Sequence, residues 1–118
     1  MNQPIRVLLV DDQQSARKGL IAILTFFPEI LVVGEAANGV EAVQLVAEQQ
    51  PDVVVMDLQM PVMDGVEATR LIKTRWPTIK VIVLTVHATR RVEAHAAGAD
   101  IYLLKGNGPE ALQDAILS

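Results

Sequence analysis

The sequence of 118 residues contains no cysteine, and its aromatic residues are limited to one Trp, one Tyr and two Phe. Without cysteine, the chain has no disulfide framework, no thiolate metal site and no cysteine nucleophile. The apolar fraction of 51% is therefore made mostly of Val, Leu, Ile and Ala. This mixture favours parallel strands that are buried on both faces and covered by helices.

Long apolar runs and an excess of positive charge are also lacking. No run approaches the ~20 apolar residues that cross a bilayer, so we expect no membrane contact. Ten Lys and Arg stand against 14 Asp and Glu, giving a net charge of −4. Nucleic-acid binding depends on cations that neutralise phosphates, so we expect none by this chain itself. These features predict a cytoplasmic protein, and the length suits one domain over residues 1–118.

Five short apolar runs predict the strands. They are rich in β-branched residues and nearly continuous, which is typical of a parallel sheet covered on both faces. They lie at residues 5–10, 30–33, 53–56, 80–84 and 101–104. Apolar residues at helical spacing lie between and after them, at residues 16–27, 43–47, 68–72, 89–97 and 111–116. The second and third of these stripes include Ala47 and Leu71. The alternation predicts an α/β fold with a doubly wound parallel sheet.

Polar residues follow four of the five predicted strands. Asp11 and Asp12 follow the first, Asp57 the third, Thr85 the fourth and Lys105 the fifth. In an open parallel sheet, ligands bind beyond the carboxyl ends of the strands, where the strand order reverses. With the strand order 2-1-3-4-5, this point lies between the first and third strands. We therefore expect three carboxylates to converge there, beside a hydroxyl and an ammonium group.

Phosphoryl transfer is the chemistry that this combination favours. Three adjacent acids repel one another unless a cation intervenes, and Mg²⁺ is commonly held by carboxylates together with phosphate oxygens. Asp57 is the best nucleophile candidate, because a carboxylate can form an acyl phosphate. Taken singly, each residue has a simpler role: Asp11 or Asp12 as a helix N-cap, Thr85 as a strand residue and Lys105 as a surface charge. Only their combination favours a site.

Four stretches agree in residue type, order and spacing with the receiver domain of bacterial two-component response regulators. They are VLLVDD (7–12), VVVMDLQMPVMDG (53–65), VIVLT (81–85) and AAGADIYLLK (96–105). The chain resembles this family over essentially its whole length. GEAANGVEAV and GVEATRLI, with Gly106 rather than Pro after the lysine, most resemble the subfamily with a C-terminal LuxR-type helix-turn-helix output domain. The resemblance implies a flavodoxin-like three-layer (βα)5 fold with strand order 2-1-3-4-5.

The resemblance also implies a role for each polar residue of the site. Asp57 would accept a phosphoryl group from the phosphohistidine of a sensor histidine kinase. Asp12, Asp57 and the backbone carbonyl of Gln59 would bind Mg²⁺, while Asp11 would act mainly through water. Lys105 would pair with the phosphoryl group and with the acids.

The resemblance further predicts switch and rate-tuning residues. Thr85 would move toward a phosphoryl oxygen and Tyr102 would turn inward, although a single ring in a strand can also be an ordinary core residue. Gln59 and His87 are expected to influence how fast water removes the phosphoryl group. Alternatively, His87 is exposed and has no role. Val86 replaces the usual Ala, Ser or Gly of the family, and its branched side chain is expected to narrow access to the acceptor.

These roles describe a phosphorylation-dependent signalling switch, with at most self-phosphorylation and self-dephosphorylation activity, and not an enzyme. The switch would act on an output domain, either in the same protein or in a partner, and most simply one that binds DNA and regulates transcription. The alternative is a stand-alone receiver that acts by protein–protein contacts. The fourth and fifth helices, with the fifth strand, form the expected homodimer face.

Other classes fit the sequence less well. An aspartate-nucleophile phosphatase would need a second Asp where Gln59 stands. A nucleotide- or flavin-binding module would need a phosphate loop after the first strand, where Asp11 and Asp12 would repel a phosphate. The complete set of acids, hydroxyl and lysine disfavours a receiver that is never phosphorylated.

Overall fold

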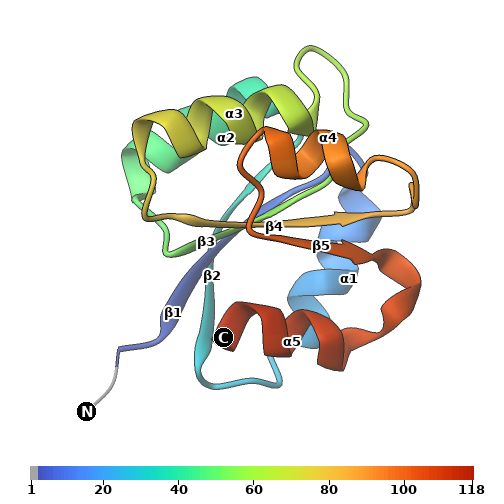
Figure 1. Ribbon diagram of the computed structural model, residues 1–118. Helices are drawn as coiled ribbons and strands as arrows, with labels where there is room; N and C mark the ends of the chain where they lie inside the picture. Colours follow the sequence, from blue (N-terminus) through green and yellow to red (C-terminus); the bar gives the residue numbers. More distant parts are fainter. Residues whose placement is uncertain (1–2) are drawn as a thin grey trace.

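The computed structural model describes residues 3–118, so the first two residues of the predicted domain lie outside the described range. Five parallel strands form one sheet in the order β2-β1-β3-β4-β5, as the sequence predicts (Figure 1). The strands are β1 (Ile5–Val10), β2 (Ile30–Ala36), β3 (Val53–Met56), β4 (Lys80–Thr85) and β5 (Ile101–Leu104).

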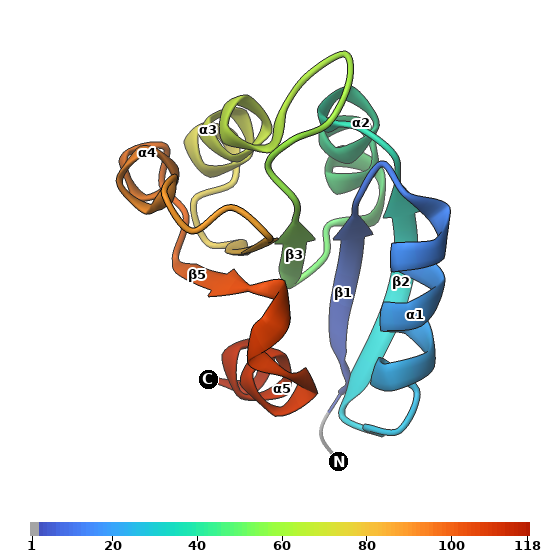
Figure 2. The ribbon, with the colours of Figure 1, turned by 90° about the vertical axis from the view of Figure 1, so that its right-hand side faces the viewer.

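Helices cover both faces of the sheet and give three layers. Helices α1 (Gln14–Leu24) and α5 (Pro109–Leu117) lie on one face. Helices α2 (Gly39–Gln49), α3 (Gly65–Arg75) and α4 (Arg91–Ala96) lie on the other (Figures 1 and 2). Within residues 3–118, no helix is long and apolar enough to span a membrane.

The apolar residues of β1 show why the strand runs are continuous. Val7 and Leu9 pack into the core that contains the apolar residues of α1 and α5. Leu8 and Val10 pack into the core under α2 and α3. Since successive side chains of a strand point to opposite faces, a sheet with two covered faces needs apolar residues at every position.

Strand β2 is longer than predicted. It continues through Gly34 and Glu35 to Ala36, and these residues pair with the last half of β1 after a register shift between Val7 and Leu8. The apolar run ends at residue 33, but pairing with β1 extends the strand beyond it. Glu35 thereby reaches the carboxyl edge of the sheet.

Several helix predictions need correction. Ala47 and Leu71 are exposed, while Ala42 and Val46 of α2 and Ile72 of α3 are buried. Each wrong position lies next to a buried residue, about 100° away around the helix. Helix α4 is also shorter than the predicted 89–97, and a 3-10 turn at Lys105–Asn107 precedes α5.

Candidate functional site

The carboxyl edge of the sheet brings together the polar residues that follow the strands. Asp11 follows β1, Asp57 follows β3, Thr85 ends β4 and Lys105 follows β5. The Nζ atom of Lys105 lies 2.7 Å from Oδ2 of Asp11 and 3.2 Å from Oδ2 of Asp57. The predicted convergence of acids and ammonium is confirmed by these distances.

Asp57 is held at the edge by its own backbone and side chain. Its N–H donates to the carbonyl oxygen of Val10, at 2.9 Å, which continues the pairing of β3 with β1. Its Oδ1 accepts a hydrogen bond from the N–H of Leu58, at 2.8 Å. Oδ2 faces Lys105, and the side chain is 12% exposed. The carboxylate is therefore oriented by protein contacts while one side remains open to the pocket.

Asp11 is the buried member of the acid cluster. Its Oδ1 accepts a hydrogen bond from the N–H of Gln13, at 2.9 Å, and its Oδ2 pairs with Lys105. The N-cap residue of α1 is Gln13, without a side-chain capping bond. The N-cap alternative for Asp11 and Asp12 is therefore excluded.

Asp12 completes a cluster of three acids. One carboxylate oxygen each from Asp11, Asp12 and Asp57 lies within 4.8 Å of the others. Asp12 is exposed, and its carboxylate accepts no hydrogen bond from any residue of the described range 3–118. Three oxygen ligands so close are the donor type that a hard divalent cation such as Mg²⁺ prefers, so the residues present fit the predicted metal.

Burial and charge act against each other in this cluster. Burial raises the pKa of Asp57 above its usual value, and this effect outweighs the opposing influence of the Lys105 charge and of the Leu58 N–H. Burial by itself lowers the pKa of the Lys105 ammonium, but its hydrogen bonds and charge interactions with Asp11 and Asp57 outweigh burial and leave that pKa raised. Lys105 therefore stays charged beside the acids.

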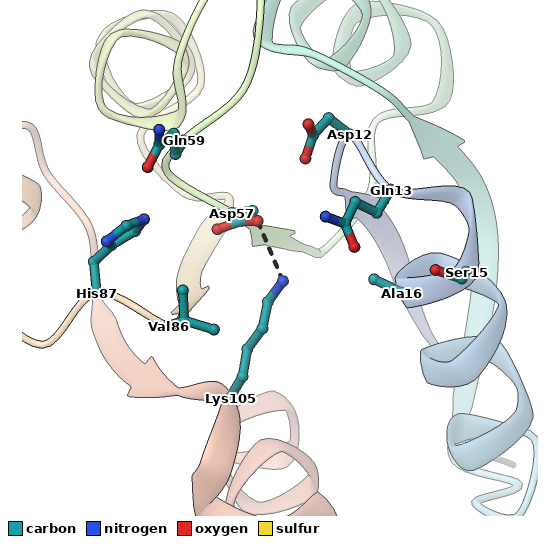
Figure 3. Close-up of a pocket in the computed structure, with 9 residues that line it drawn as sticks. All are labelled: Asp12, Gln13, Ser15, Ala16, Asp57, Gln59, Val86, His87 and Lys105. Carbon is teal, nitrogen blue, oxygen red and sulfur yellow. Dashed lines mark hydrogen bonds and ion pairs between the residues drawn. The ribbon is translucent and has the colours of Figure 1, made fainter.

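A pocket opens over Asp57 (Figure 3). Asp12 and Gln13 lie on one side of Asp57, Gln59 and His87 lie on the other, and Lys105 reaches in from the turn that follows β5. Residues Asp12, Gln13, Ser15, Ala16, Asp57, Gln59, Val86, His87 and Lys105 line it. The sequence motifs give no role to Gln13, Ser15 and Ala16. Their position directly after the acid pair, at the start of a helix that begins at this edge, is the signal that would have found them.

The three residues predicted to tune the rate all line this pocket. Val86 is 69% exposed and stands at the pocket wall next to His87. His87 is half-buried, so it is not an exposed residue without neighbours. Their effects on reaction rates stay predictions.

Thr85 and Tyr102 are buried, do not line the pocket and are joined through His87. The Oγ1 atom of Thr85 accepts a hydrogen bond from the N–H of His87, at 3.2 Å. The hydroxyl of Tyr102 donates to the carbonyl oxygen of His87. Tyr102 is 4% exposed, and the guanidinium of Arg91 lies 4.9 Å from its ring centroid. The ring is already buried in this structure, within an apolar cluster that includes Leu58 and Val83. A movement of Tyr102 on phosphorylation stays a prediction.

A doubly wound sheet with an acid cluster and a paired lysine at its carboxyl edge defines a receiver-type signalling module, and comparison with known proteins leads to the same class. The sequence pattern of the response regulator receiver domain matches residues 7–117. The transcriptional regulatory protein LiaR of Bacillus subtilis is 46% identical over 114 residues, which are 95% of this chain and 54% of LiaR. The chain belongs to the response regulator receiver domain family and is not a classical enzyme.

Solved structures agree with this assignment. A two-component response regulator of the LuxR family from Aurantimonas sp. SI85-9A1 has a TM-score of 0.92 and 37% identity, covering 98% of this chain and 84% of that one. A chain of the CheX-CheY-BeF3-Mg complex from Borrelia burgdorferi has a TM-score of 0.88 and 25% identity, covering 97% and 87%. The chain spans about half the length of the curated relatives that it matches.

Proposed function

We propose that this domain is a phosphorylation-dependent switch that accepts a phosphoryl group on Asp57 in a reaction that requires Mg²⁺. The observation that carries the proposal is the position of Asp57. Its carboxylate faces an open pocket, has Lys105 at 3.2 Å, and lies in the acid cluster with Asp11 and Asp12.

The proposed step is a substitution at phosphorus. A carboxylate oxygen of Asp57 attacks the phosphorus of a phosphohistidine of a sensor histidine kinase; the P–N bond breaks, its electron pair stays on the imidazole, and an acyl phosphate forms. Lys105 neutralises charge on the transferred oxygens. No other reactant is needed, and water later returns the carboxylate and free phosphate.

Asp12, Asp57 and the backbone carbonyl of Gln59 are the proposed Mg²⁺ ligands. Asp11 is buried and does not line the pocket, whereas Asp12 and Asp57 do, which suits an indirect role for Asp11 through water. The bound ion would supply positive charge against the phosphoryl oxygens. The name of the related Borrelia complex includes both Mg and BeF3, which supports the same ion here.

The hydrogen bonds of His87 suggest how the switch would work. If the Thr85 hydroxyl moves toward a phosphoryl oxygen, it leaves the N–H of His87, to which it is now bonded. The peptide of His87 is then freer to move, and with it the carbonyl oxygen that holds the Tyr102 hydroxyl. A local charge change would in this way alter the surface around β5 and α4.

The output and its setting belong to the same proposal. Because LiaR is a transcriptional regulatory protein, a DNA-binding output domain, in the same protein or in a partner, is the favoured target; a stand-alone receiver that acts by protein contacts is the second candidate. The domain would act in the cytoplasm, and a homodimer would use α4, β5 and α5.

Incubation with acetyl phosphate and Mg²⁺, followed by intact mass measurement, tests the proposal. We expect one phosphate adduct on the native chain, and none for Asp57→Asn or without Mg²⁺. The variant Asp114→Asn, which changes an exposed aspartate of α5, should be labelled like the native chain. An adduct on Asp57→Asn would contradict the proposal.

A further inference from the structure

A single guanidinium group connects three elements at the edge of the acid site. The Nε atom of Arg17, on α1, lies 2.9 Å from Oε1 of Glu35, on β2. Its Nη1 atom donates to the backbone carbonyl oxygen of Asp11, at 2.6 Å. The side chain of Arg17 is only 14% exposed. Charge-assisted hydrogen bonds in such a sheltered place are among the stronger ones in proteins.

The carbonyl that Arg17 binds belongs to the peptide between Asp11 and Asp12. On the other side of Asp11, its N–H donates to the carbonyl oxygen of Ala36, at 3.0 Å. The backbone of Asp11 is therefore held on both sides. Its N–H is bonded to Ala36 of β2, and its carbonyl oxygen is bonded to Arg17, which is itself paired with Glu35 of β2. The exposed Asp12 carboxylate, by contrast, has no hydrogen-bond donor within residues 3–118, so its position depends on the Cα–Cβ direction that the backbone sets.

We propose that Arg17, itself anchored by Glu35, is a positioning residue that fixes the Asp11–Asp12 peptide and thereby aims the Asp12 carboxylate into the Mg²⁺ site. This inference rests on the proposed function, because it concerns the same metal. Partners that orient a ligand from outside typically change metal affinity by about 10–100-fold when they are removed.

The geometry requires arginine rather than a simple positive charge. A guanidinium is planar and presents its donors in a fixed fork, so Nε and Nη1 can bind Glu35 and the Asp11 carbonyl at once. A lysine ammonium is a compact charge on a flexible stem, and it would not fix the positions of Glu35 and the Asp11 carbonyl relative to each other as a guanidinium does. The neutral variant would lose both bonds.

Electrostatics and positioning predict opposite results, which makes the inference testable. Removal of a positive charge near three carboxylates would by itself strengthen the binding of a cation. Loss of the positioning bonds would weaken it, because Asp12 would then sample other directions. A purely structural ion pair would change the free energy of unfolding and leave the Mg²⁺ affinity of the folded chain unchanged.

The experiment is calorimetric titration of the native chain and its variants with Mg²⁺ alone. We expect the Kd to rise about tenfold in Arg17→Met and by a smaller factor in Arg17→Lys, which keeps the charge. Arg70→Lys and Arg70→Met are the matched controls, because Arg70 forms an exposed ion pair with Glu67 on α3, and their Kd should be native. Equal or tighter binding by the Arg17 variants would overturn the inference.

Two further measurements test whether Arg17 acts through Asp12. The double variant Arg17→Lys, Asp12→Asn should bind Mg²⁺ no more weakly than Asp12→Asn alone, because Arg17 acts through Asp12; full additivity would contradict this. In the metal-free protein, the backbone order parameter of Asp12 should fall in Arg17→Lys.

If Arg17→Met does not fold, the Mg²⁺ affinity of Arg17→Lys decides whether Arg17 positions Asp12. Absence of Mg²⁺ binding by the native chain would contradict the proposed site itself, and the inference with it.

Discussion

Gly65 lies so close to Asp57 that a Cβ atom on Gly65 would be 1.9 Å from the carbonyl oxygen of Asp57. The N–H of Gly65 also donates to the carbonyl oxygen of Leu58, at 2.7 Å. Helix α3 begins at this point, with Asp64 as its N-cap accepting a hydrogen bond from the N–H of Glu67. The start of α3 therefore packs directly on the backbone of the proposed phosphoacceptor, and only glycine allows this contact.

The substitution Gly65→Ala should lower the free energy of unfolding by about 1–3 kcal/mol, as expected for overpacking. It should also slow labelling by acetyl phosphate, because the Asp57 backbone must shift. Gly19→Ala is the control: apart from its chain neighbours and the backbone of α1 itself, nothing lies within 4 Å of the Cβ position of Gly19, so alanine should stabilise by about 0.5–1 kcal/mol. Urea denaturation measures the free energy of unfolding of both variants. A value for Gly65→Ala equal to that of the native chain would contradict the prediction.

The substitution Lys105→Met should slow labelling of Asp57 by about a hundredfold, the scale expected for the loss of one preorganised electrostatic group. The methionine keeps most of the length of the side chain but removes the charge that lies 2.7 Å from Asp11 and 3.2 Å from Asp57. Lys18→Met, at an exposed position of α1, should label at the native rate. The initial rate of adduct formation is the measurement. Equal rates for the two variants would show that Lys105 has no role in the transfer.

The substitution Val86→Ala should increase the rate of labelling, or of hydrolysis, severalfold, because the branched side chain lines the mouth of the pocket. Val92→Ala is the matched control, since Val92 is 83% exposed on α4 and does not line the pocket. The rates come from a time course of intact mass with acetyl phosphate and after its removal. If both rates of Val86→Ala equal those of the native chain, Val86 does not restrict access.

The raised pKa of Asp57 predicts how stability changes with pH. Burial raises this pKa in the folded chain above the value near 3.8 of a free aspartate, so the folded chain retains the proton to a higher pH than the unfolded chain. Stability is therefore lost as the pH rises from about 3.8 through the raised pKa, and the loss persists above it. In the absence of Mg²⁺, Asp57→Asn should be more stable than the native chain at pH 7.

This difference should disappear as the pH falls below about 3.8, where the carboxyl group is protonated in both states. Urea denaturation at a series of pH values measures it. Asp114→Asn, at an exposed position of α5, should leave the stability unchanged throughout. A difference between Asp57→Asn and the native chain that is constant with pH would contradict the explanation by burial of a charge.

The sequence predicts the strands well because burial on both faces leaves an unbroken apolar run. The bounds of β1, β3 and β5 agree with the predicted residues 5–10, 53–56 and 101–104. It also predicts where the acids and the lysine lie, because the carboxyl ends of parallel strands meet at one edge whatever the details of packing. Asp11, Asp57 and Lys105 are brought together by topology alone.

The features that the sequence does not predict depend on long-range contacts. The extension of β2 to Ala36 comes from pairing with β1, and no local pattern indicates it. The contacts of Arg17 with Glu35 and with the Asp11 carbonyl join residues whose separation in sequence gives no signal. The bonds of His87 to Thr85 and Tyr102 depend likewise on the path of a loop.

Location of the phosphoryl group on the chain tests the central claim most directly. Borohydride reduces an acyl phosphate of aspartate to homoserine, which peptide mass spectrometry can assign to a residue. After reaction with acetyl phosphate and Mg²⁺, the account predicts homoserine at position 57 and at no other aspartate. Homoserine at Asp11 or Asp12, or a phosphate adduct that yields no homoserine, would contradict it.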